Sequence, residues 1–153
     1  MDDARADAGL PFVDEHARLV AAPPERAWDA LVRVLPRAFG GSSAQRFARI
    51  VGCETTAADG AFPAEGGAIV GFRVARSAPP RELALVGRHR FSDYALVFHL
   101  DALDEGRATR VRARTHAAFP GAAGRAYRLA VIGTRGHVLV VRRLLRAVER
   151  RAI

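Results

Sequence analysis

The chain has 153 residues, of which 50% are hydrophobic, and its formal net charge is +8. This length suits one domain with one core, and the hydrophobic content excludes disorder along the whole chain. The 24 basic residues are all arginine and are spread along the sequence. We therefore interpret the charge as a solvated basic surface and expect no nucleic-acid partner.

Residues 1–10 begin with an acidic, polar run, and we expect them to form a flexible N-terminal tail. They lack the apolar run of a signal peptide, and no apolar stretch reaches the length that spans a bilayer. Residues 11–153 show no internal repeat and no linker. We therefore expect a cytoplasmic protein with one domain over residues 11–153 and no integral membrane segment. Both a monomer and a homodimer stay open.

The first predicted elements are a strand and two helices. Phe12 to Val20 is bounded by prolines and predicts a strand. Pro23-Pro24-Glu25 then opens a helix, because proline and an acidic residue both suit a first helical turn. Apolar residues continue at helical spacing as far as Pro36. A second, short helix is expected from Ser43 to about Ala48.

The sequence then changes to a period of two, which is typical of β-strands. Strands are predicted over residues 50–56, 68–75, 82–89, 94–100 and 109–119. In the last of these, apolar residues alternate with Arg110, Arg112, Arg114 and His116. This alternation predicts antiparallel strands with one face on a core and the other in water. Cys53, the single cysteine, falls in the first of these strands and is expected to be a small buried residue.

Residues 124–150 return to helical spacing and predict one long helix. Its apolar face is wide, which indicates a helix surrounded by other elements. Gly133 and Gly136 lie on this face, although glycine costs about 1 kcal/mol relative to alanine inside a helix. They are explained either by close packing of the helix against the sheet or by space for a ligand.

The segment Val20–Trp28, which reads Val-Ala-Ala-Pro-Pro-Glu-Arg-Ala-Trp, resembles the strand-to-helix junction of the START-like superfamily, also called SRPBCC. That superfamily includes polyketide cyclases, lipid-transfer domains and pollen-allergen-like proteins. Residues 87–92 and 127–133 are similar to an actinobacterial branch of uncharacterised function. The resemblance covers nearly the whole chain after residue 11.

The resemblance implies an α+β, helix-grip fold. In this fold a curved antiparallel sheet of six or seven strands wraps around a long C-terminal helix, with two short helices after the first strand. A cavity between the sheet and the long helix is also implied. The superfamily shares no catalytic residues, so the resemblance implies no active site.

The faces that should line this cavity combine apolar side chains with a few polar tips, which is typical of a small-molecule site. The predicted ligand-binding residues are Phe72, Leu85, His89, Tyr94, Phe98, Thr115, Leu129, Gly133, Gly136 and Val140. The alternative is that the aromatic members simply fill the core.

His89 and Tyr94 are the only candidates for catalysis, because both are expected to face inward from neighbouring strands. A buried, neutral imidazole can accept a proton. The alternative is a histidine with a structural role. No metal site is predicted, because His116 and His137 lack ligand spacing with any cysteine or acidic residue. No cofactor is predicted either, since phosphate-loop and dinucleotide motifs are missing.

Three functions follow from these observations. The first is a carrier or sensor that binds a small apolar molecule, such as a lipid, a polyketide or an aromatic compound. The second is an enzyme of the cyclase or dehydratase type that uses His89 and Tyr94 in the same cavity. The third is an interaction protein whose arginine row, Arg110, Arg112 and Arg114, meets an acidic partner or an anionic membrane together with the arginine stripe of the C-terminal helix. The first is preferred, because the sequence offers a pocket but no convincing reactive group.

Overall fold

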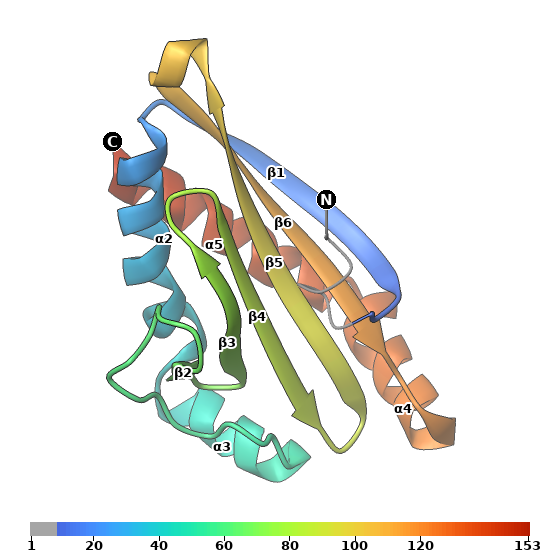
Figure 1. The fold of residues 1–153 in the computed structure, drawn as a ribbon. Coiled ribbons are helices and arrows are strands. Elements are labelled where there is room, and N and C mark those ends of the chain that lie inside the picture. Colours follow the sequence, from blue (N-terminus) through green and yellow to red (C-terminus); the bar gives the residue numbers. More distant parts are fainter. Residues whose placement is uncertain (1–8) are drawn as a thin grey trace.

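Six antiparallel strands form one curved sheet in the computed structural model, which describes residues 9–153 (Figure 1). The strands follow one another across the sheet in the order β1-β6-β5-β4-β3-β2. Their bounds are β1 Phe12–Val20, β2 Ala68–Ile69, β3 Phe72–Ala78, β4 Glu82–His89, β5 Ser92–Leu103 and β6 Ala108–Ala118. Of the tail expected over residues 1–10, residues 1–8 lie outside the described part of the chain. His116 was predicted to face water but is buried. Its Nδ1 forms a hydrogen bond with the carbonyl oxygen of Leu10, at 3.3 Å.

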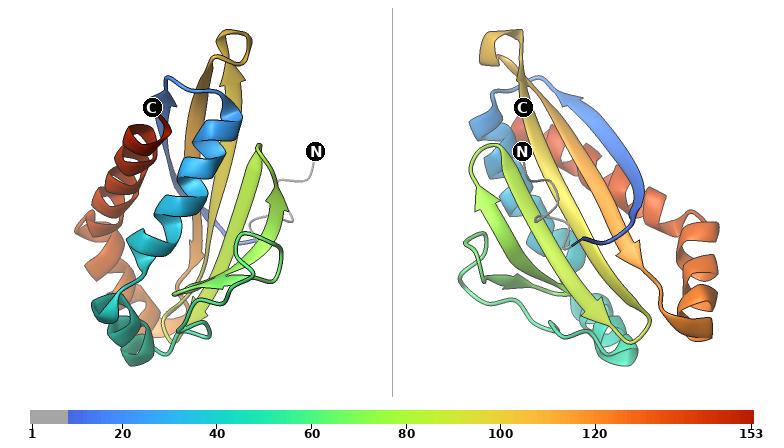
Figure 2. Two further views of the ribbon diagram at one scale, coloured as in Figure 1. Left: turned by 90° about the vertical axis from the view of Figure 1, so that its left-hand side faces the viewer. Right: turned by 45° about the vertical axis from the view of Figure 1, so that its right-hand side comes forward.

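Four α-helices accompany this sheet within residues 9–153. They are α2 Pro24–Phe39, α3 Ser42–Val51, α4 Gly121–Arg128 and α5 Gly136–Ala152. A 3-10 turn, η1 (Asp104–Gly106), joins β5 to β6, and a π-helical turn, η2 (Leu129–Gly133), follows α4. Figure 2 shows α2 and α5 on one face of the sheet, while the other face carries no helix. This arrangement confirms the predicted α+β, helix-grip fold.

The hydrophobic core lies between α2, α5 and the sheet. Pro24 stands in the first turn of α2, where the missing N–H of proline costs nothing. Leu31 and Leu35 follow at helical spacing and are fully buried. Together with Phe98 on β5 and Val148 on α5 they belong to one continuous cluster. The helical period of the sequence therefore corresponds to the face of α2 that packs on the sheet.

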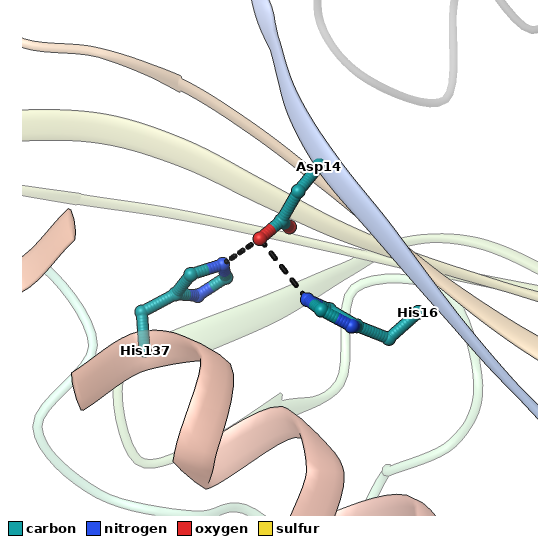
Figure 3. A group of neighbouring side chains, drawn as sticks. All are labelled: Asp14, His16 and His137. Atoms are coloured by element: carbon teal, nitrogen blue, oxygen red, sulfur yellow. Dashed lines mark hydrogen bonds and ion pairs between the residues drawn. The ribbon is translucent and has the colours of Figure 1, made fainter. Parts of the chain in front are cut away.

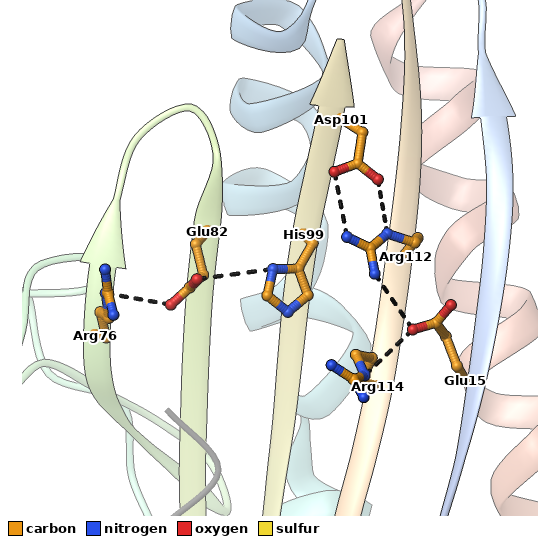
Figure 4. Close-up of polar contacts among 7 residues, drawn as sticks. All are labelled: Glu15, Arg76, Glu82, His99, Asp101, Arg112 and Arg114. Carbon is orange, nitrogen blue, oxygen red and sulfur yellow. Dashed lines mark hydrogen bonds and ion pairs between the residues drawn. The ribbon is translucent and has the colours of Figure 1, made fainter. Parts of the chain in front are cut away.

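The opposite face of the sheet carries a layer of paired charges (Figure 4). Arg112 on β6 donates two hydrogen bonds to Asp101 on β5, with Nε–Oδ2 at 2.7 Å and Nη2–Oδ1 at 3.2 Å. Glu15 on β1 forms ion pairs with Arg112 at 3.4 Å and with Arg114 at 3.2 Å. The predicted alternation along β6 is present, but carboxylates of the same sheet engage Arg112 and Arg114.

The strand predicted over residues 50–56 is wrong. The helix expected over 43–48 continues to Val51 and ends at Gly52, which adopts a left-handed conformation with φ 73°. In that conformation the N–H of Cys53 bonds the carbonyl of Ala48 at 2.8 Å, a typical helix C-cap. Cys53 therefore lies in the loop after α3, where it is half-buried.

The single long helix predicted over residues 124–150 is also wrong, because it is broken. After η2 the backbone of Arg135 is left-handed, with φ 59°, and α5 starts at Gly136. Leu129, expected to be covered, is 72% exposed, and the helix buries its apolar side chains only from Val141 onward. Among residues 9–153, no helix has both the length and the apolar character needed to cross a membrane.

Candidate functional site

A cavity of about 620 Å³ lies between the sheet and the broken C-terminal helix. Its walls come from the end of α2, from α3, from β3 to β6 and from the segment Tyr127–Val141. Most of the lining side chains are apolar. Phe47 on α3 and Val140 on α5 line the cavity and are 53% and 47% exposed, so the cavity reaches the surface of the protein at these residues. Both the volume and the lining suit a small-molecule site.

One wall of the cavity is a chain of aromatic rings. The ring of Phe72 lies 4.9 Å from that of Phe39 and 5.3 Å from that of Tyr94. The imidazole of His89 continues the chain, 5.4 Å from Tyr94 and 4.8 Å from Tyr127. These separations are within the range in which ring pairs attract each other beyond their buried area. The wall is therefore packed and preformed.

The hydroxyl of Tyr94 is already used inside the fold. It donates a hydrogen bond to the carbonyl of Gly71 at 2.6 Å, and Cys53 Sγ lies 3.8 Å from it. Burial raises the pKa of Tyr94 far above its ordinary value, and the neighbouring Cys53 adds to this. Burial likewise raises the pKa of the Cys53 thiol. Neither group supplies an anion for chemistry near neutral pH.

His89 is held as a neutral imidazole. Burial lowers its pKa below the ordinary 6.5, although the carboxylate of Asp93 opposes the shift. The N–H of Phe91 donates to His89 Nδ1 at 3.0 Å, which places the imidazole hydrogen on Nε2. No hydrogen bond joins His89 to Tyr94, although both line the cavity. His89 can therefore donate a hydrogen bond to a ligand from Nε2. The lone pair of Nδ1 already accepts a hydrogen bond from the backbone of Phe91.

Thr115 supplies a polar group without a partner. It lies on β6 among cavity-lining residues, and its Oγ1 is buried with no hydrogen-bond partner within the described chain. A buried hydroxyl without a partner costs about 1–3 kcal/mol. Thr115 lines the cavity while its Oγ1 is closed to solvent, so a molecule in the cavity would reach this hydroxyl only after the side chain rotates.

Of the residues predicted to bind a ligand, six line the cavity: Phe72, His89, Tyr94, Thr115, Gly136 and Val140. Four do not. Leu85 and Phe98 are fully buried members of the core, because their strand positions lie under the helix pair. Leu129 and Gly133 are exposed where the helix is broken. Gly133 is not closely packed either, since a Cβ atom there would meet nothing nearer than 3.9 Å.

Sequence reasoning missed lining residues that lie outside the regular strands. Phe39 is the last residue of α2, Cys53 follows α3, and Tyr127 lies near the end of α4. The aromatic character of Phe39 and Tyr127 was a usable signal. Their position next to β-strands was not, because it depends on how the loops return the chain.

A cluster of three polar side chains, Asp14, His16 and His137, adjoins the cavity, and His137 lines the cavity itself. The atoms of these side chains that could bind a metal lie within 4.8 Å of one another. Within residues 9–153 no other group of three such side chains meets this distance. The prediction of no metal site rested on spacing along the sequence. Folding brings His137 to Asp14 across 123 positions.

Comparisons with known proteins identify the fold. No protein-family model matches the chain, and no curated protein matches its sequence. Solved structures do match. Protein Ms6760 from Mycobacterium smegmatis superposes with a TM-score of 0.58 at 14% identity, covering 92% of this chain and 96% of that one. Protein CV1439 from Chromobacterium violaceum gives a TM-score of 0.56 at 16% identity, with the same coverage.

The matches also include Cgl2372 from Corynebacterium glutamicum, described as a Polyketide_cyc-like protein. Its TM-score is 0.45 at 15% identity, and the match covers 90% of this chain and 88% of that one. At such identities, structural likeness concerns the fold alone. The expected helix-grip fold is confirmed, and what the cavity holds has to be argued from its own residues.

Proposed function

We propose that this helix-grip domain binds one small apolar molecule in the cavity, as a carrier or sensor. The observation that carries the proposal is a preformed, mostly apolar cavity of about 620 Å³ whose lining includes only a few polar side chains, among them His89 and Thr115.

The polar tips define what the ligand should look like. His89 offers an Nε2–H donor, and Thr115 can donate or accept one hydrogen bond once its side chain turns toward the cavity. Aromatic rings make up the wall between them and the end of α2. We therefore favour a ligand with an apolar or aromatic body and one or two oxygen atoms, such as a lipid, a polyketide or a hydroxylated aromatic compound.

A cyclase or dehydratase in the same cavity remains the second candidate, because His89 and Tyr94 both line it. The contacts of these residues argue against acid–base chemistry. The Tyr94 proton is committed to the Gly71 carbonyl, and the lone pair of His89 Nδ1 accepts from Phe91 N–H. A ligand would have to break one of these bonds before either group could transfer a proton.

An interaction protein that uses its arginine row is the third candidate, and it is weakened by the pairing on that face of the sheet. Arg112 and Arg114 are engaged by Glu15, and Arg112 also by Asp101. Charges that are neutralised within the same sheet attract an acidic partner less strongly.

Native mass spectrometry of the purified protein, followed by denaturing extraction, tests the proposal. We expect a small apolar molecule at up to one per chain. If the protein is purified empty, titration with the fluorescent probe anilinonaphthalene sulfonate should saturate at one site per chain. A protein that carries no small molecule and binds no probe would overturn the carrier proposal.

A further inference from the structure

Asp14, His16 and His137 meet where β1 passes the start of α5 (Figure 3). Asp14 and His16 are two residues apart on a strand, so their side chains leave the same face. His137 is the second residue of α5. Its Nε2 lies 2.8 Å from Asp14 Oδ2, and His16 Nε2 lies 3.1 Å from the same oxygen atom. One carboxylate oxygen is thus shared by two imidazoles.

The surroundings of this cluster suit a bound cation. The side chains are mostly covered, and that of His137 is only 12% exposed. No arginine pairs with Asp14 in the described part of the chain. The second carboxylate oxygen, Asp14 Oδ1, is buried and has no hydrogen-bond partner. Two hydrogen bonds to imidazoles therefore leave half of the carboxylate unsatisfied, which is costly for a charged group.

We propose that Asp14, His16 and His137 bind one divalent first-row transition-metal ion of the Zn²⁺ class. Two imidazole nitrogens and one carboxylate oxygen form a donor set that such ions favour. In a tetrahedral site with bonds of about 2.0–2.1 Å, neighbouring ligand atoms lie about 3.3 Å apart. The observed separations from Asp14 Oδ2, 2.8 and 3.1 Å, need only small adjustments to reach this value.

Three protein ligands leave at least one coordination position for water or another small donor. The ion would join β1 to the first turn of α5. This turn packs little against the core, because the buried residues of α5 begin only at Val141. Since His137 also lines the cavity, the site adjoins the ligand cavity. It does not depend on the proposed apolar ligand, because neither Asp14 nor His16 lines that cavity.

Calorimetric titration of the untagged, chelator-treated protein with Zn²⁺ tests this inference. We expect one ion per chain and at least a tenfold loss of affinity in both His16→Ala and His137→Ala. The matched control is His89→Ala, which removes a half-buried histidine outside the cluster and should keep the wild-type affinity. A second readout is the visible spectrum of the Co²⁺-loaded protein. A four-coordinate ion should give absorption bands at roughly 500–700 nm.

A network of hydrogen bonds without a metal is the alternative, and His137→Gln separates the two. Glutamine can still donate to Asp14 but is a poor metal ligand, so this variant should fold normally, by circular dichroism, and lose Zn²⁺ binding. Absence of binding in the wild-type protein, or binding that survives both His16→Ala and His137→Ala, would overturn the metal site. Binding of the fluorescent probe in the cavity is measured separately and bears only on the proposed function.

Discussion

Gly87 on β4 lies directly across from Tyr94 on β5, and the tyrosine ring fills the space that a side chain at position 87 would need. A Cβ atom at Gly87 would be 2.3 Å from Tyr94 Cε2 and 2.3 Å from the Gly71 carbonyl oxygen. The glycine thus allows the ring to lie flat on the sheet and its hydroxyl to reach Gly71. This pair fixes the aromatic wall of the cavity.

Gly87→Ala should destabilise the protein, because a methyl group at this position overlaps both a ring and a backbone carbonyl. We expect a loss of about 1–3 kcal/mol in the free energy of unfolding, measured by urea denaturation. Gly133→Ala is the matched control, since a Cβ atom there meets nothing nearer than 3.9 Å. Equal stability of the two variants would show that the contact at Gly87 is relieved elsewhere.

Tyr94→Phe removes the hydrogen bond to Gly71 and keeps the ring. The half-buried Gly71 carbonyl then lacks its donor, and we expect a loss of about 1–2 kcal/mol in the free energy of unfolding. Tyr127→Phe is the control, because the Tyr127 hydroxyl makes no hydrogen bond within the described chain while its ring belongs to the same wall. A Tyr94→Phe variant as stable as the control would mean that water replaces the hydroxyl at Gly71.

Thr115→Val replaces the unpartnered hydroxyl with a methyl group of similar size. The ligand-free protein should gain about 1 kcal/mol of stability in urea denaturation, because an unsatisfied buried group is removed. If the copurified molecule bonds to Thr115, its affinity should fall at the same time. Ala113→Ser is the contrasting variant. Ala113 lies two residues away and is fully buried in the filled core, so a new hydroxyl there should lower the stability. A loss of stability in Thr115→Val would indicate that its hydroxyl already has a partner in solution.

Gly136→Leu should reduce binding of anilinonaphthalene sulfonate while the fold survives. Gly136 lines the cavity, and a Cβ atom there has room, 3.6 Å from Thr134 Oγ1. A leucine can therefore extend into the mouth and occupy volume needed by a ligand. Gly133→Leu is the matched control, because Gly133 lies three residues away and does not line the cavity. Probe affinity that is unchanged in Gly136→Leu would place the ligand elsewhere.

The ion pair of Asp101 with Arg112 predicts a dependence of stability on pH. The hydrogen bond from Arg112 lowers the pKa of Asp101 below its ordinary 3.8. A carboxyl group with a lowered pKa in the folded state stabilises the protein above its unfolded pKa, and this contribution is lost as the pH falls through the folded value. Asp101→Asn should therefore cost about 0.5–1 kcal/mol at pH 7, a modest figure because the pair is partly exposed.

The difference between Asp101→Asn and the wild-type protein should shrink below a pH of about 4, as measured by thermal unfolding at several pH values. Asp29→Asn is the control, since Asp29 is exposed on α2 and makes no ion pair within the described residues. A difference that stays constant from pH 7 to about pH 3 would show that the charge of Asp101 does not contribute to the stability of the folded protein.

Periodicity predicted the fold well where one face of an element is buried along its whole length. The strands from Glu82 to Ala118 and the helix that starts after Pro23 follow this rule. The rule failed at α3, whose last turn resembles a strand in sequence, because the left-handed Gly52 decides where that helix ends. It failed again at residues 129–135, where apolar side chains are exposed at a break that a hydropathy pattern does not register.

The candidate site was predictable only in part, and for a related reason. Phe72, His89, Tyr94 and Thr115 could be found because strand parity determines which side chains face inward. Strand parity does not determine how far along the sheet the core ends and the cavity begins, so Leu85 and Phe98 were assigned to the wrong side of that boundary. The meeting of Asp14 with His137 follows from the packing of α5 against β1, which no local pattern records.

The segments before and after the start of the buried part of α5 differ in how many substitutions they can tolerate. From residue 121 to residue 140 only Gly124 is buried, whereas α5 beyond that point shares the core with α2 and the sheet. Segments with few buried contacts open locally at low free energy and exchange their amide hydrogens quickly. Substitutions around the cavity mouth can therefore change which molecules enter, and how fast, without lowering the stability of the domain. A lineage can diversify its ligands at this mouth while the sheet stays nearly constant.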